Sequence, residues 1–146
     1  CNGFQILLES GLLPGAMLRN VDLKFICRYV TLRVERSDTP FTNRFCVGQV
    51  IRMPIAHNEG NYTAEKSVLL TLQRQRQALF RYCDADGQHT ISSNPNGSVD
   101  AIAGLCNAQG NVMGLMPHPE RSSETELGSV DGRLLFESLI EAMSRA

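Results

Sequence analysis

The sequence lacks the features that mark several classes of protein. No apolar run approaches the length of a membrane span, and no charged segment followed by an apolar one opens the chain. The 14 basic and 15 acidic side chains give a net charge of −1, so there is no basic field to attract nucleic acid or an anionic membrane surface. Internal repeats, low-complexity tracts and linkers are missing too. These absences predict a soluble, cytoplasmic protein with no nucleic-acid or membrane partner.

Cysteine is present, but paired cysteine motifs are not. The five cysteines are odd in number and widely spaced, and none belongs to a Cys-x-x-Cys pair: Cys1, Cys27, Cys46, Cys83 and Cys106. This pattern argues against a disulfide framework and against a zinc site, and for a reducing compartment. We therefore predict that no metal is bound. The last four cysteines lie in or beside apolar, strand-like stretches, where Cys acts as a small hydrophobe; Cys1 is the exception.

The alternation of apolar stretches and turn residues predicts a layered α/β domain. A chain of 146 residues, 42% of them apolar, is long enough for one such core. We expect a helix after Cys1 that stops at Pro14, and further helices over 64–77 and 131–143, the last with Asp131 as its N-cap. Strands are expected over 25–30, 32–34, 48–56 and 79–83, and residues 102–116 should form an antiparallel hairpin.

The second arm of that hairpin delivers the first candidate catalytic pair. Residues 112–116 are an apolar run that ends at Pro117, and His118 and Glu120 follow directly. A histidine that titrates near neutrality, with a carboxylate two residues away, has the chemistry of the general base and orienting acid of a catalytic triad. A lone His-x-Glu also occurs in ordinary exposed turns. The pair supplies no nucleophile of its own.

Cys1 is the candidate nucleophile, because it directly precedes a predicted helix. The positive end of a helix dipole lowers the pKa of such a thiol and offers backbone N–H groups to an anion. Gly3 would let backbone or substrate approach the sulfur, which is the logic of a nucleophile elbow with Cys in place of Ser. A cysteine at position 1 also suits an N-terminal-nucleophile hydrolase, whose own amine is the base. That alternative leaves His118 and Glu120 without a role.

The motif Cys1-x-Gly3-x-Gln5 near the start and the motif His118-Pro119-Glu120 near the end together resemble the two signatures of class I (triad-type) glutamine amidotransferases. Within that family, the intervening sequence resembles the glutamine amidotransferase subunits of phosphoribosylformylglycinamidine synthases, in their small stand-alone form. The segments that carry this resemblance are 54–57, 59–62, 94–98, 102–104 and 110–121. The resemblance covers essentially the whole chain.

The resemblance implies a fold and an extent. The fold would be a layered, mostly parallel sheet flanked by helices, flavodoxin-like, with a small antiparallel hairpin portion. Residues 1–146 would be the C-terminal portion of a single glutamine amidotransferase domain. The first strands of the central sheet, and one oxyanion strand, would lie in an N-terminal part that this sequence does not include.

The resemblance also implies a reaction and roles. Cys1 would attack the side-chain amide of glutamine, His118 would act as acid and base, and Glu120 would orient His118, giving glutamate and ammonia. The backbone N–H of Asn2 would be one oxyanion donor. Gly3 and Gln5 would shape the glutamine pocket.

The implied partners are a synthetase subunit and a small accessory subunit. The synthetase would bind ATP and magnesium and convert formylglycinamide ribonucleotide to formylglycinamidine ribonucleotide in de novo purine biosynthesis, and this chain would carry no cofactor. Six polar residues at predicted strand ends and turns are candidates for that interface or for the pocket rim, although solvated turns look the same: His57, Glu59, Asn61, Asn94, Asn96 and Ser98. Two other functions stay open: a class I amidotransferase of another synthase, and an inactive fragment that only binds its synthetase.

Overall fold

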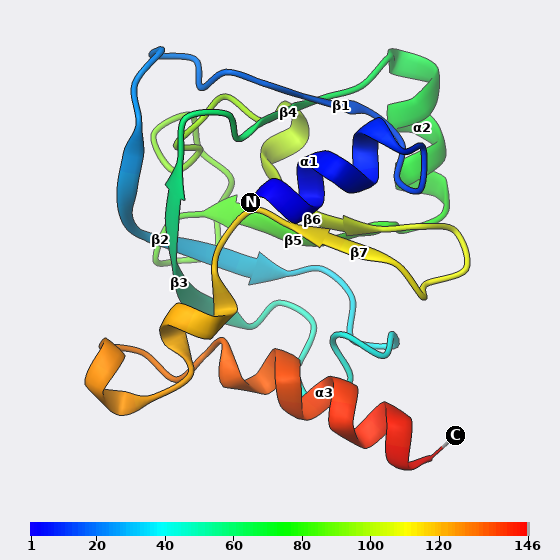
Figure 1. Cartoon of the computed structure of the whole chain (residues 1–146), viewed down its shortest axis with the longest axis vertical. Coiled ribbons are helices and arrows are strands. Elements are labelled where there is room, and N and C mark those ends of the chain that lie inside the picture. The colour runs from blue at the N-terminus through cyan, green and yellow to red at the C-terminus, as the bar shows by residue number, and fades with distance from the viewer. Residues whose placement is uncertain (146) are drawn as a thin grey trace.

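A curled sheet of five strands in the order β3-β2-β5-β6-β7 forms the centre of the computed structural model, which describes residues 1–145 (Figure 1). Its strands are β2 (Ile26–Val34), β3 (Val50–His57), β5 (Ala78–Cys83), β6 (Ile102–Cys106) and β7 (Met113–Leu115). A second, two-stranded sheet pairs β1 (Ala16–Leu18) with β4 (Asn61–Thr63). The α-helices are α1 (Asn2–Glu9), α2 (Lys66–Arg74) and α3 (Arg133–Ser144), and short 3-10 turns span Val99–Ala101, Pro119–Ser122 and Thr125–Leu127.

The direction of the strands differs from the expectation. The α/β class and the antiparallel pairing of β6 with β7 are confirmed, but every strand pair of the described residues is antiparallel. The prediction of a mostly parallel sheet is therefore wrong for residues 1–145. Parallel neighbours need a crossover connection, usually a helix, whereas residues 35–49 join β2 to β3 without one.

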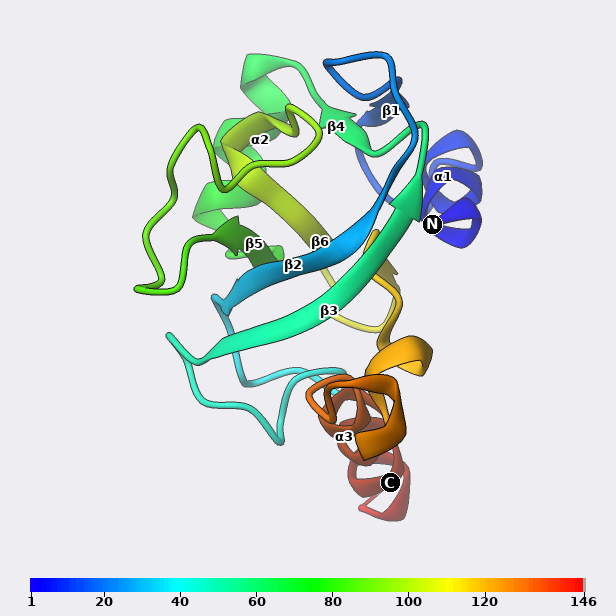
Figure 2. The same cartoon turned by 90° about the vertical axis from the view of Figure 1, so that its left-hand side faces the viewer.

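Both faces of the sheet are covered, as the two views show together (Figure 2). One core lies between the sheet and α3; its fully buried members include Leu32, Met53 and Phe80, with Leu135 reaching in from the helix. The other core lies between the sheet and α1, α2 and β4. It contains the buried residues Phe4, Leu8, Leu13, Tyr62, Leu72, Leu105 and Met116.

The glycine of β7 lets α1 lie directly on the sheet. An added Cβ at Gly114 would overlap the ring of Phe4 and would lie 2.8 Å from Cδ1 of Leu13. No side chain larger than hydrogen fits between the strand and the helix, so α1 sits close to β7. As a result Cys1, at the N-terminal end of α1, is held at the end of β7, where its nitrogen donates to the carbonyl of Leu115 at 3.2 Å.

The three predicted α-helices are confirmed, although the predicted cap of the last one is wrong. Gly132, not Asp131, is the N-cap residue of α3. The Asp131 carboxylate instead accepts the backbone N–H of Arg52 at 2.7 Å. The loop before α3 is thereby fixed to the free edge of β3, which also carries the candidate site.

Candidate active site

The free edge of β3 organises the site. In an antiparallel edge strand, alternate residues point both backbone groups away from the sheet. Arg52, Pro54 and Ala56 do so here, since each has a backbone group in contact with a segment outside the sheet. Pro54 suits this position, because its missing N–H faces away from the β2 ladder and costs no strand bond. The edge therefore offers carbonyl groups at regular intervals.

Cys1 and His118 occupy neighbouring positions along this edge. The Cys1 sulfur lies 3.9 Å from the carbonyl of Ala56, and the backbone N–H of His118 donates to the carbonyl of Pro54 at 2.8 Å. Carbonyls two residues apart on a strand are separated by roughly 7 Å. The start of α1 also lies next to the beginning of the segment that leads from β7 into the 3-10 turn (Figure 1). The fold thus brings together the two ends of the candidate triad, which are far apart in sequence.

His118 has one ring nitrogen engaged and the other free. Its Nδ1 lies 2.7 Å from Oε1 of Glu120, and a carboxylate can only accept, so Nδ1 carries the hydrogen. Nε2 is buried and has no hydrogen-bond partner among the described residues. Buried polar atoms without a partner are uncommon and call for an explanation. An unpaired lone pair on Nε2 is what a general base needs.

Glu120 stays ionised. Partial burial works to raise the pKa of its carboxyl, but the hydrogen bond with His118, a backbone hydrogen bond and the charges of His118 and Arg121 outweigh it, and the pKa is lowered. A carboxylate at neutral pH fixes the tautomer of His118 and stabilises its protonated form. The pair therefore has the electrostatics of the acid-base half of a triad.

The residues expected around Cys1 lie on the exposed side of α1. Asn2 and Gly3 are exposed, and a Cβ added at Gly3 would meet nothing within 4 Å. Gln5 lies about one turn along the helix, and its Nε2 donates to Oε2 of Glu59 at 3.2 Å. The oxyanion role of Asn2 and the pocket roles of Gly3 and Gln5 stay predictions. The open space beside Gly3 leaves room for a ligand there.

Three of the six expected rim or interface residues are buried instead. His57 and Ser98 are each 2% exposed and Asn96 is 0% exposed, so their side chains cannot line a rim or touch a partner. Asn96 bonds directly to the other two, to the ring of His57 and to the backbone N–H of Ser98. In the sequence, a polar cluster at a strand end looks the same whether its side chains face water or one another. Glu59, Asn61 and Asn94 are at least partly accessible, and their assignment stays a prediction.

One buried polar residue escaped the sequence analysis. Asn20 is 0% exposed and bonds to both His57 and Gly60. It lies in an irregular segment between β1 and β2, among residues that are mostly exposed. Nothing in its local sequence distinguishes it from a solvated loop asparagine.

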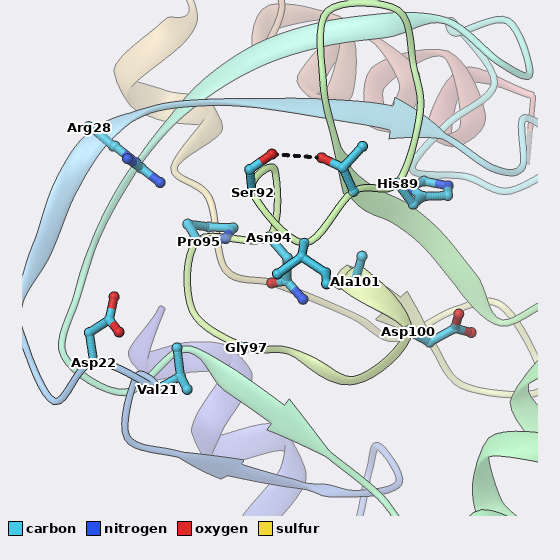
Figure 3. A pocket seen from close by; sticks show the side chains of 12 residues that line it. Val21, Asp22, Arg28, His89, Ser92, Asn94, Pro95, Gly97, Asp100 and Ala101 are labelled. Carbon is cyan, nitrogen blue, oxygen red and sulfur yellow. Dashed lines mark hydrogen bonds between the residues drawn. The ribbon is translucent and has the colours of Figure 1, made fainter.

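A hollow of about 630 Å³ lies elsewhere, between the segment that leads into β2 and the loop before β6 (Figure 3). Charged, polar and apolar side chains line this hollow, among them Asp22, Arg28, His89 and Pro95. Cys1, His118 and Glu120 do not belong to it. The triad candidate is thus defined by its chemistry and not by the size of a cavity.

None of the helices in residues 1–145 is long and apolar enough to cross a membrane. The same residues hold no group of three or more His, Cys, Asp or Glu side chains placed to bind a metal ion. The expectation that this chain carries no metal or cofactor stays a prediction, because a cofactor can also be bound without a cluster of His, Cys, Asp or Glu side chains.

Comparisons with known proteins agree on one family. A family model described as the CobB/CobQ-like glutamine amidotransferase domain matches residues 1–133. The phosphoribosylformylglycinamidine synthase subunit PurQ of Moorella thermoacetica is 57% identical over 145 residues, which are 99% of this chain and 61% of that protein. The PurQ subunit of Acaryochloris marina is also 57% identical, over 98% of this chain and 61% of its own length. The chain thus spans about three fifths of the length of these curated relatives.

A solved structure is similar as well. A chain in the structure of PurLQS from Thermotoga maritima superposes with a TM-score of 0.82 at 46% sequence identity. The match covers 97% of this chain and 59% of that chain. Identity at this level over nearly the whole sequence extends the likeness from the fold to the side chains.

Proposed function

The chain belongs to the family of CobB/CobQ-like glutamine amidotransferase domains, and from this premise we propose that Cys1, His118 and Glu120 hydrolyse the side-chain amide of glutamine. The observation that carries the proposal is the state of His118. Its Nδ1–H is held by Glu120 at 2.7 Å, while its buried Nε2 has no partner in residues 1–145. A base in this state, beside a cysteine at the N-cap position of a helix, fits acyl transfer.

The proposed reaction has two halves. His118 Nε2 takes the thiol proton, and the Cys1 sulfur attacks the amide carbon of glutamine. The tetrahedral oxyanion, held by the backbone N–H of Asn2, collapses to a γ-glutamyl thioester as His118 returns the proton to the leaving nitrogen, releasing ammonia. A water molecule, deprotonated by His118, then attacks the thioester and frees glutamate. Glu120 stabilises the imidazolium that forms in each half.

Substrate would enter over the exposed start of α1. The free space beside Gly3 admits the reacting amide near the sulfur. Gln5 and Glu59, bonded at 3.2 Å, then form the far side of the pocket. Glu59 is also 4.0 Å from Arg19, so this wall presents both charges, which suits the zwitterionic end of an amino acid.

We further propose that the ammonia passes to a synthetase subunit. The curated relatives are named as subunits of phosphoribosylformylglycinamidine synthase, and the similar solved structure is that of PurLQS. The partner would bind ATP and magnesium and convert formylglycinamide ribonucleotide to formylglycinamidine ribonucleotide, assisted by a small accessory subunit, in purine biosynthesis. Five free thiols, two of them exposed, support a reducing, cytoplasmic setting.

Selective alkylation tests the glutaminase proposal. The chain is treated with a diazo-ketone analogue of glutamine and analysed by peptide mass spectrometry, with Cys1→Ser as the control. We expect one label per chain at Cys1, suppressed by excess glutamine. The exposed Cys27 and Cys46 serve as internal controls and should stay unlabelled. Equal labelling of all three thiols, or no labelling of a folded chain, would contradict catalysis by this chain and leave a fragment that only binds its synthetase.

A further inference from the structure

A closed network of buried polar side chains lies directly behind the candidate site. It consists of Asn20, His57, Tyr82, Asn96 and Ser98, and we call it the His57 network. Each of these residues is at most 2% exposed. Burying this much polar surface is costly unless the groups satisfy one another, and a satisfied network fixes the surrounding chain in one arrangement.

Asn20 uses its whole side-chain amide within this network. Its Oδ1 accepts from His57 Nδ1 and from the backbone N–H of Gly60, both at 3.0 Å. Its Nδ2 donates to the carbonyls of Lys24 at 2.8 Å and His57 at 2.9 Å. Since Asn20 Oδ1 is an acceptor, His57 carries its hydrogen on Nδ1. His57 Nε2 then accepts from Asn96 Nδ2 at 3.4 Å.

The His57 network contacts two segments that border the candidate pocket. His57 follows Ala56, whose carbonyl touches the Cys1 sulfur. Gly60, held by Asn20, follows Glu59, which bonds to Gln5 on α1. A Cβ on Gly60 would lie 2.6 Å from His57 Nε2, so the loop over 58–60 can close onto the imidazole only with glycine there. His57 thus connects both segments, the end of β3 beside Cys1 and the 58–60 loop, to the same buried network.

His57 is neutral at physiological pH. Burial is the main cause that lowers its pKa to about 4, and the charge of His118 acts in the same direction. A neutral imidazole can donate to Asn20 and accept from Asn96 at once, which a protonated one cannot. Its neutrality also spares His118 a second positive charge nearby.

We propose that His57 is a positioning residue for the glutaminase reaction. Through Asn20 it holds the 58–60 loop, and with it the Glu59–Gln5 wall, at a fixed distance from the Cys1 thiol. His57 touches neither substrate nor sulfur. This inference rests on the proposed function, because it assigns His57 and Asn20, the part of the network that holds the 58–60 loop, a role in placing glutamine over Cys1.

The test compares two alkylation rates at Cys1. A diazo-ketone analogue of glutamine needs the whole pocket, whereas iodoacetamide needs only the thiol, so the ratio of the two rates measures glutamine positioning. We expect His57→Leu, which fills the space without hydrogen bonds, to lower this ratio at least tenfold. His57→Gln, which keeps one hydrogen bond, should recover part of the loss.

Tyr82→Phe is the matched control. It removes the 3.1 Å hydrogen bond between Asn96 and the Tyr82 hydroxyl, at the end of the network away from Cys1. It should lower the urea midpoint yet leave the ratio unchanged. An unchanged ratio in folded His57→Gln, or an equal drop in Tyr82→Phe, would overturn the inference. If His57→Leu does not fold, the His57→Gln comparison decides. Failure of the unmodified chain to label at Cys1 would instead reject the proposed function.

Discussion

In the proposed reaction, Glu120 determines which nitrogen of His118 acts as the base. The hydrogen on Nδ1 is committed to the carboxylate at 2.7 Å, and Nε2 is left as the basic atom. Without the carboxylate, the imidazole could turn or change tautomer, and its protonated form would lose its counter-charge. The short spacing in His118-Pro119-Glu120 is therefore a structural requirement, since the 3-10 turn beginning at Pro119 folds the two side chains onto each other.

We expect Glu120→Gln to reduce glutamine hydrolysis by up to about 10⁴-fold, the loss found when the carboxylate of a serine-protease triad is replaced by an amide. The amide can still accept a hydrogen bond, but it can also donate one and favour the wrong tautomer. The measurement is glutamate release by the chain assembled with its synthetase partner. Glu124→Gln, which removes an exposed carboxylate nearby, should have no effect. Equal activity of the two variants would contradict the orienting role.

The sequence points to the proposed reacting residues more readily than to the residues that support them. Cys1 directly precedes a predicted helix, and His118 and Glu120 directly follow the proline that ends a predicted strand. Both boundaries can be recognised in the sequence. His57, Asn96 and Ser98 also lie at strand ends and turns, but the prediction that they line the rim is wrong, because they are buried. Whether a polar cluster turns inward depends on partners far away in sequence, here Asn20 and Tyr82. The local sequence around a polar residue does not reveal such distant partners.

At the scale of elements, the contact between α1 and β7 sets the position of Cys1, the proposed nucleophile. The helix lies against the strand because position 114 has no side chain. The hydrophobic residues on the inner face of α1, Phe4 and Leu8, are 2% and 6% exposed. The packing of α1 against β7 therefore determines where Cys1, at the start of the helix, lies.

Gly114→Ala should destabilise the chain by about 1–3 kcal/mol, the usual cost of overpacking a core. The added Cβ would overlap the ring of Phe4 and would also lie 2.8 Å from Cδ1 of Leu13, so two packed side chains would have to shift. The free energy of unfolding is measured by urea titration. Gly3→Ala, in helix α1, is the control: its Cβ meets nothing within 4 Å, so the free energy of unfolding should stay the same or rise by up to about 1 kcal/mol. Unaltered stability of Gly114→Ala would mean that the helix shifts freely.

The direction of the strands was the element-level feature that the sequence did not reveal. Strands β5 and β6 are buried along nearly their whole length, with burial on both faces. Such continuous apolar runs are typical of parallel sheets covered by helices. Here the same coverage arises around an antiparallel sheet, with α3 on one face and α1 and α2 on the other. Periodicity reports burial and not strand direction.

At the scale of the whole molecule, the sheet joins two cores and the site lies at its edge. The core under α3 and the core under α1 share the strands between them. The free edge of β3 holds Cys1, the 117–120 turn and the loop before α3 through its outward-facing backbone groups. Loss of either core would therefore displace the nucleophile, the base or both.

The stability of the whole molecule should fall with acid below about pH 6.5, and His57 gives the reason. Its pKa is lowered by burial to about 4 in the folded chain, against 6.5 for the free side chain. Between these values the unfolded state binds the extra proton, so the free energy of unfolding rises with pH there and is lost as pH falls toward 4. A difference of this size corresponds to about 3 kcal/mol at most.

Urea titrations at pH 7.5, 5.5 and 4.5 measure this loss. The pKa of Glu120 is also lowered in the folded chain, so its contribution is present at neutral pH and disappears only at the acid end of the series, as the carboxylate protonates. The two contributions can be separated with His57→Gln, which has no imidazole at the buried position. Its urea midpoint should start lower at pH 7.5 but change less between pH 7.5 and 5.5 than that of the unmodified chain. Parallel curves for the two proteins over this interval would show that the buried imidazole does not control acid stability, and that the His57 network accepts a proton without opening.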